Sequence, residues 1–204
     1  MMRAISKALR TIRGNTRGGS SVEFAVAFPF LCMFLFGYGE FGTLATRAVM
    51  LERGLDIAIR EVRLGNIPTD LGNVSAEEAA DFQRELIKFR ICQNAFLLVD
   101  CRQDLNVELI AIPLGDPIPT NEISCVDRAA EEINPPAQMN FGTAGAADLE
   151  VMLVRACLVV DPIFEIGGWL AGVQITDPDT GEVVDHAIFA QTAFAREPAP
   201  TVGN

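Results

Sequence analysis

The fold is decided by one stretch near the N-terminus, RGGSSVEFAVAFPFLCMFLFGYGEF, residues 17–41. No charged residue lies between Phe24 and Gly39, and after Glu40 the apolar character continues to Thr46. A helix that crosses the hydrocarbon core needs about 20 residues at about 1.5 Å each, and Val22–Thr46 is long enough. The sequence therefore predicts one transmembrane helix, with Glu40 near its outer interface.

The leader before this stretch sets the direction of insertion. It holds five basic residues and no acidic one: Arg3, Lys7, Arg10, Arg13 and Arg17. Positive charge beside a span is retained in the cytoplasm, so the rest of the chain is sent outward. A cleaved secretory signal is the alternative, but its apolar core is usually about 7–15 residues long and ends at an Ala-x-Ala site, which is not evident here.

Glu23 needs a physical explanation, because a carboxylate at the edge of an apolar helix carries a desolvation cost. The sequence suggests three compensations: a place in the first helical turn, headgroup depth, or a cation supplied within an assembly. Cleavage between Gly18 and Gly19 would make Glu23 the fifth residue and create an amine at Gly19. The Gly19 amine of one copy could then pair with the Glu23 carboxylate of its neighbour and fix the register between the two.

These features resemble a known family. Gly18, Glu23, Phe24 and Pro29, followed by Gly39-Glu40-Phe41-Gly42, are similar to the TadE-like pseudopilins of the tight-adherence (Flp) pilus, a type IV pilus system. The segment Thr192–Pro198 also resembles the closing segment of that family. The resemblance covers both ends of the chain, whereas the middle matches only in its cysteines and strands.

The resemblance implies a function in assembly. Its members are cleaved by a prepilin peptidase, here after Gly18, and act as minor pilins with other pilins and the assembly platform in the inner membrane. Glu23 would be the glutamate at position five, with Phe24 and Pro29 in the assembly helix. The resemblance implies no enzyme activity and no cofactor. It does not separate TadE-type from TadF-type proteins.

Composition indicates an acidic domain behind the anchor. The chain has 204 residues, is 50% hydrophobic and carries a net charge of -11. Its mean hydropathy is +0.26. Without the five basic leader residues, 11 Lys+Arg face 27 Asp+Glu, a net charge of -16. Such a surface disfavours nucleic acid and anionic headgroups as partners.

Cysteine positions point to an oxidising compartment. Cys32 lies in the apolar helix, where a lone thiol acts as a small hydrophobe. The other four, Cys92, Cys101, Cys125 and Cys157, form an even set in the exported part. Three pairings are open, and proximity favours Cys92–Cys101 with Cys125–Cys157. A zinc site is the alternative, but Cys-x-x-Cys spacing is absent and His186 is the only histidine, so no metal site is expected.

The fold class expected from the pattern is α+β and pilin-like. Apolar residues at helical spacing extend the first helix to about Leu64, and Ser75 with Glu78 forms a capping box for a second helix that runs towards Cys92. Four β-like runs predict strands: 105–113, 149–160, 171–176 and 183–195. The turn Asp177–Gly181 joins the last two as a hairpin. An antiparallel sheet should pack on the helices.

These expectations divide the chain into five parts. They are a leader (1–18), a transmembrane and assembly helix (19–46), its continuation (47–65), a disulfide-bonded periplasmic head (66–197) and a flexible tail (198–204). The localisation expected is single-pass in the inner membrane, with the N-terminus cytoplasmic and the head periplasmic or incorporated in the extracellular pilus.

Catalytic patterns are missing from the sequence. It contains no Gly-x-Ser-x-Gly elbow, phosphate loop or His-Glu-x-x-His helix. His186 fits a surface or edge position. The aromatic run Phe164–Leu170 could close the core, touch the membrane or dock on a partner. The alternative to a pilin is a permanently anchored periplasmic domain that binds a partner or small ligand.

Overall fold

A computed structural model describes residues 19–64, 66–68, 74–113, 115–119, 123, 125–126, 128, 139, 150–163, 173–176 and 183–196. The leader, Phe164–Leu170, Asp177–Gly181 and the tail lie outside the described residues. The elements are α2 (Gly19–Arg63), α3 (Ala76–Asn94), α4 (Cys101–Asp104), β1 (Leu105–Pro113), β2 (Glu150–Val160), β3 (Val173–Thr176) and β4 (Val183–Arg196).

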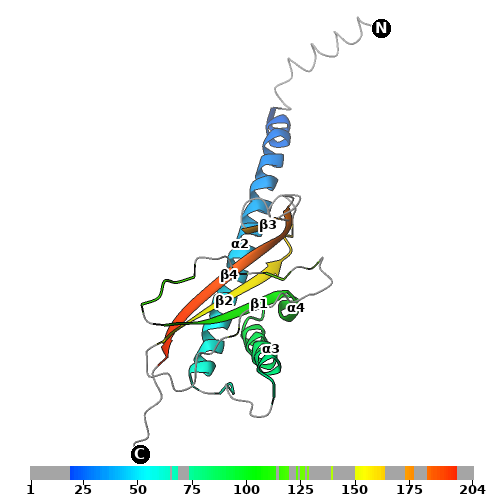
Figure 1. The fold of residues 1–204 in the computed structure, drawn as a ribbon. Coiled ribbons are helices and arrows are strands. Elements are labelled where there is room, and N and C mark those ends of the chain that lie inside the picture. Colours follow the sequence, from blue (N-terminus) through cyan, green and yellow to red (C-terminus); the bar gives the residue numbers. More distant parts are fainter. Residues whose placement is uncertain are drawn as a thin grey trace, which may run out of the picture.

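Helix α2 gives the molecule its elongated shape. Its N-terminal half stands clear of the other elements, and its C-terminal half runs along the sheet (Figure 1). The helix continues through Pro29, whose ring removes one backbone donor. Arg60 and Arg63 in its last turn complement the negative end of the helix dipole. The helix ends one residue before the predicted end at Leu64.

Helix α3 begins where the sequence predicts. Ser75 is its N-cap, the Ser75 hydroxyl accepts from the Glu78 amide, and the Glu78 carboxylate accepts from the Ser75 amide. Hydrogen bonds from Ser75 lower the pKa of Glu78. The capping box is therefore confirmed, and the helix extends two residues past Cys92 to Asn94.

The described strands form one antiparallel sheet in the order β1-β2-β4-β3. Strand β2 pairs with β4 along its full length and with β1 from Glu150 to Leu158. The expected pairing of the last two strands is confirmed for Val173–Thr176, and Ala171, the predicted start of the strand, lies outside the described residues. The short helix α4 was not predicted, because four residues are too few to show a helical period.

The core lies between the sheet and the two long helices. Alternate residues of β2 face this core, among them Val154, Ala156 and Leu158, as expected from the period of two in a strand. They pack with residues of α2 and α3 that include Leu51, Leu55, Ile87 and Ile91. The α+β class with a long apolar N-terminal helix and an antiparallel sheet is therefore confirmed.

The opposite face of β2 is buried too. Leu153, Cys157 and Val159 are almost fully covered, and Val126 is buried beside Cys125, which is bonded to Cys157. The connection between β1 and β2 is thus fastened to the outer face of the sheet at this point.

Burial of Lys88 on α3 should make the stability of the fold depend on pH. Its side chain is buried, and burial lowers the pKa below the usual 10.5, although Glu85 at 3.4 Å acts in the opposite direction. The unfolded chain then binds the Lys88 proton more tightly than the folded chain does. Stability contributed by Lys88 must therefore rise as pH increases through the lowered pKa towards 10.5.

We expect the wild-type protein to gain stability relative to Lys88→Met as pH rises through the lowered pKa towards 10.5. Guanidinium unfolding of both proteins at several pH values measures this difference. A Cys32→Ala background prevents thiolate attack on the disulfides. Parallel pH profiles for the two proteins would contradict the expected coupling.

Candidate assembly surface and head attachment

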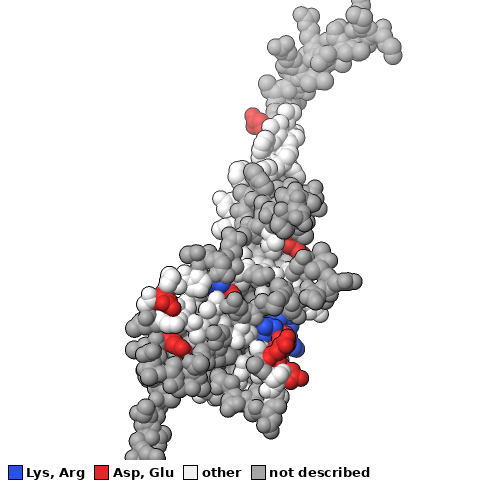
Figure 2. All heavy atoms as spheres, viewed as in Figure 1, with Lys and Arg blue, Asp and Glu red and all other residues white. Residues whose placement is uncertain are grey.

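The projecting half of α2 presents an apolar surface on all sides. Figure 2 shows this column standing clear of the head, white apart from an acidic group near its N-terminal end. Its exposed side chains are large: Val22, Phe24, Val26, Phe28, Phe30, Leu31, Met33, Phe34, Leu35, Phe36 and Tyr38. Isolated soluble proteins rarely expose a patch of this size. The helix is long and apolar enough to cross a membrane.

Glu23, Phe24 and Pro29 lie on this column. Glu23 is exposed, and no cation within residues 19–64 forms an ion pair with it. Phe24 packs on Phe28 with ring centroids 5.2 Å apart. The helix begins at Gly19 and has no acidic residue in its first turn, which corrects the first-turn position expected for Glu23. The helix dipole weakens beyond that turn, so it does little for this carboxylate.

Three glycines of α2 leave room for a close neighbour. A Cβ atom added at Gly37, Gly39 or Gly42 would meet nothing within 4 Å. Small residues let helix backbones approach one another in lipid, where van der Waals packing drives association. This surface can therefore accept lipid chains or another helix. Gly18, the other predicted processing residue, lies outside the described residues.

The head is attached to α2 at Glu40 and Arg47. The Glu40 side chain is 2% exposed, and its Oε1 accepts a hydrogen bond of 2.9 Å from the Ile163 amide. Arg47 Nη1 donates to the Asp161 carbonyl oxygen at 3.0 Å. Both contacts reach the segment that leaves β2. The sequence offered no signal for them, because they join residues more than 100 positions apart.

Arg128 connects this segment to the rest of the head. Its guanidinium contacts the carboxylates of Asp104 at 2.7 Å, Asp161 at 2.6 Å and Asp185 at 3.5 Å. The hydrogen bond with Asp104 is the main cause of a raised pKa at Arg128. Burial raises the pKa of Asp185, and Arg128 counteracts this. The cluster is therefore an organised ion-pair network, and no metal-binding group is found among the described residues.

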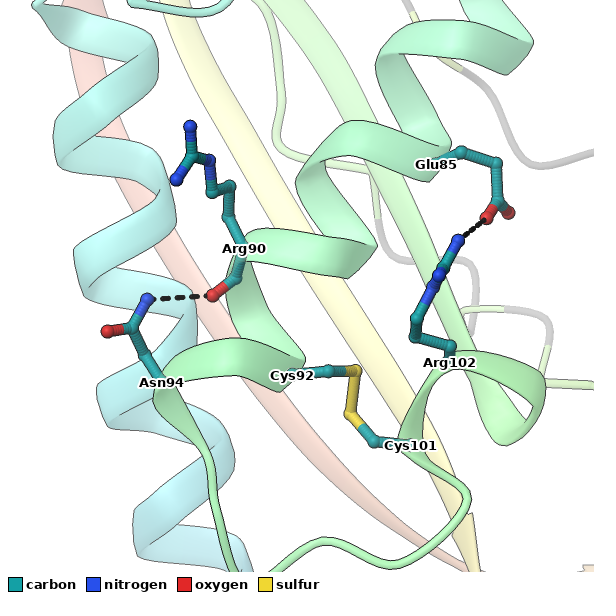
Figure 3. The surroundings of a disulfide bond; sticks show 6 residues. All are labelled: Glu85, Arg90, Cys92, Asn94, Cys101 and Arg102. Carbon is teal, nitrogen blue, oxygen red and sulfur yellow. Dashed lines mark hydrogen bonds and ion pairs between the residues drawn. A yellow bond between two sulfur atoms is a disulfide. The ribbon is translucent and has the colours of Figure 1, made fainter.

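The two disulfides follow the pairing that proximity favoured. Cys92 bonds Cys101 with a Cα–Cα distance of 5.8 Å, and Cys125 bonds Cys157 with 5.4 Å. Figure 3 shows the first bond joining the end of α3 to α4, with Arg102 reaching back to Glu85. Cys32 is a free thiol and half-buried.

The loop closed by Cys92–Cys101 is a second exposed apolar surface. Phe96, Leu97 and Val99 are 74%, 43% and 75% exposed. This surface was not predicted, although the sequence has the apolar run Ala95-Phe96-Leu97-Leu98-Val99 between the two cysteines. The other apolar candidate, Phe164–Leu170, lies outside the described residues.

His186 lies on β4, opposite Val160 of β2 and Gln174 of β3, and is half-buried. Its backbone neighbours on both sides are therefore sheet strands.

Comparison with known proteins gives no family assignment. No protein-family model, curated protein or solved structure matches this chain.

Proposed function

We propose that the protein is a non-enzymatic, pilin-class subunit, cleaved by a prepilin peptidase after Gly18 and assembled through α2 into a tight-adherence pilus. The observation that carries this proposal is the division of α2: one half is bare and apolar, and the other half is the spine of a disulfide-bonded α+β head. This arrangement leaves a helix surface for assembly while the head stays folded.

In this proposal, Glu23 sets the register between the α2 helices of neighbouring subunits. The side chain is exposed on the apolar column and lies four residues after Gly19, whose new amine would be the cation of a neighbouring subunit. In lipid or in a helical bundle, an unpaired carboxylate is costly, so pairing selects one register. Phe24, Pro29 and the three open glycines of α2 form the surrounding contact surface.

The head fits the periplasm. Disulfides persist in oxidising compartments, and the head contains two of them. With the basic leader retained in the cytoplasm, α2 would cross the inner membrane once and deliver the head outward. The partners are then the inner membrane, the prepilin peptidase, other pilins and the assembly platform.

The N-terminal sequence of the protein tests the proposal. It is determined on protein from membranes of cells with and without the prepilin peptidase. A start at Gly19 that requires the peptidase is expected. An intact Met1 in both strains would contradict pilin-type processing.

Glu23→Ala should leave membrane insertion and cleavage intact but lower recovery of the protein with other pilins about tenfold, which corresponds to about 1.4 kcal/mol. Quantitative immunoblotting of sheared pili and membranes measures the ratio. Glu52→Ala is the matched control, because Glu52 is an exposed acid of α2 beyond the apolar half. Equal recovery of Glu23→Ala and the control would remove the registration role.

The alternative is a permanently anchored periplasmic module. The exposed Phe96, Leu97 and Val99 favour it, since such a loop suits contact with a partner protein. Under this alternative, Met1 stays in place and Glu23→Ala has no effect on partner binding, whereas Phe96→Ser weakens it.

A further inference from the structure

Two acidic residues bracket the apolar half of α2, and the structure treats them differently. Glu23 is exposed, whereas Glu40 is among the most deeply buried side chains in the described residues. Beyond Glu40, Phe41–Thr46 is again uncharged, so composition alone would let the bilayer extend to Arg47. The end of the membrane-embedded part of α2 must therefore be set by the contacts of the fold.

Glu40 and Arg47 hold the same segment of the head. Seven residues apart, they complete nearly two turns and lie on one side of the helix. Ile163 N donates to Glu40 Oε1, and Arg47 donates to the carbonyl of Asp161. Leu44, between them on this side, is buried in the core. The head therefore covers one side of α2 from Glu40 onward.

Polar backbone and charge at this edge cannot follow the helix into hydrocarbon. The segment 161–163 is not part of a strand or helix, and irregular backbone is excluded from the lipid-exposed hydrocarbon region. Asp161 also carries the ion pair with Arg128, which is tied in turn to α4 and β4. Pulling Phe41–Thr46 into the bilayer would require this network to break or to be immersed.

We propose that Glu40 and Arg47 form a latch that sets the depth of α2 in the membrane. The latch holds the edge of the head beside Glu40, so the bilayer takes Ser20–Gly39, about 20 residues or about 30 Å, which matches the hydrocarbon core. Phe41–Thr46 stays outside, although its composition permits insertion. Glu40 is then a positioning residue and not a second registration residue.

This inference rests on the membrane insertion of α2 that the proposed function includes, but not on cleavage or pilus assembly. Its failure is therefore distinguishable from failure of the pilin assignment, which the N-terminal sequence tests separately.

Thiol labelling of the full chain in membranes tests the latch. In a Cys32→Ala background, single substitutions Met33→Cys, Ala45→Cys and Glu52→Cys place thiols at three exposed positions along α2. A membrane-impermeant maleimide is added from the side of the head. We expect Ala45→Cys to label as fully as Glu52→Cys, and Met33→Cys to label at least tenfold less.

Variants of Glu40 and Arg47 then test whether the latch contacts, and not the hydropathy of α2 alone, set the end of the span. Glu40→Gln keeps an oxygen that can accept from Ile163 N, so labelling at Ala45→Cys should not change. Glu40→Leu removes the acceptor and joins the two apolar runs, so this labelling should fall about tenfold. Arg47→Ala is an independent break that leaves Glu40 in place and should also lower it. Intact disulfides on a non-reducing gel verify that each head is folded.

Protection of Ala45→Cys in the otherwise unchanged protein would overturn the inference, because the span would then reach Thr46. Unchanged labelling in both Glu40→Leu and Arg47→Ala would overturn it as well. Strong labelling of Met33→Cys would show that α2 does not span, and the latch and the membrane anchor would fail together.

Discussion

Replacing Gly54 with valine is expected to destabilise the head by about 2–3 kcal/mol, the usual cost of forcing atoms into a packed core. A Cβ at this position would lie 2.7 Å from the carbonyl oxygen of Ile91 and 3.2 Å from the Cβ of Ala95. Both neighbours belong to α3 or its C-terminal end, and a backbone oxygen cannot rotate away. Helices α2 and α3 would have to separate, which opens the core around Leu51 and Leu55.

Guanidinium unfolding of the full chain in detergent, followed by circular dichroism, measures the loss. Gly42→Val is the matched control, because it places the same side chain in the same helix where a Cβ meets nothing. Valine has a helix propensity slightly better than that of glycine, so the control should change stability by less than about 0.5 kcal/mol. Equal losses of stability at the two positions would mean that the close approach of α2 and α3 at Gly54 does not contribute to the free energy of unfolding.

Features with local causes could be predicted from the sequence. The capping box needs only Ser75 and Glu78, three residues apart, and the structure confirms both hydrogen bonds. Strand β1 has the predicted bounds, since it is a short segment rich in Leu, Ile and Val that ends at a proline. The apolar length of α2 likewise depends on composition alone.

Features that depend on tertiary packing could not be predicted. Gly54 looked like an ordinary helical residue, and only the approach of α3 shows why a side chain does not fit. Arg128 meets three carboxylates from separate parts of the chain, a contact that the sheet order creates. Glu40 was predicted near the outer interface, but its hydrogen bond with the amide of Ile163, distant in sequence, could not be predicted.

The candidate site was predicted in part for the same reason. Glu23, Phe24 and Pro29 were predicted as assembly residues, and the structure exposes the apolar helix that carries them. The pairing Cys125–Cys157 was favoured by proximity, but a separation of 32 residues left alternatives open until the fold was known. The amine proposed to pair with Glu23 belongs to another chain, so the fold of one chain does not contain that contact.

Glu108→Ala should destabilise the head by about 3–5 kcal/mol, the range found when one partner of a buried ion pair is removed. Glu108 on β1 lies directly opposite Arg155 on β2, and the two side chains are only 10% and 9% exposed. Arg155 Nε donates to Glu108 Oε2 at 3.0 Å. Removal of the carboxylate takes away the buried ion pair and the two hydrogen bonds that Arg155 donates to it.

The double variant Glu108→Leu with Arg155→Met distinguishes two effects. One is the cost of leaving a single buried charge, and the other is the net contribution of the ion pair to stability. Apolar replacement of a whole buried pair is often neutral or stabilising, so we expect the double variant to unfold within about 1 kcal/mol of wild type. Asp81→Ala removes an exposed acid from its pair with Arg84 and should cost less than about 1 kcal/mol. If the double variant lost as much stability as Glu108→Ala, the ion pair would stabilise the fold more than an apolar pair in the same place does. The expected result instead makes it a constraint on strand register, since any slip of β1 along β2 would place Glu108 away from Arg155.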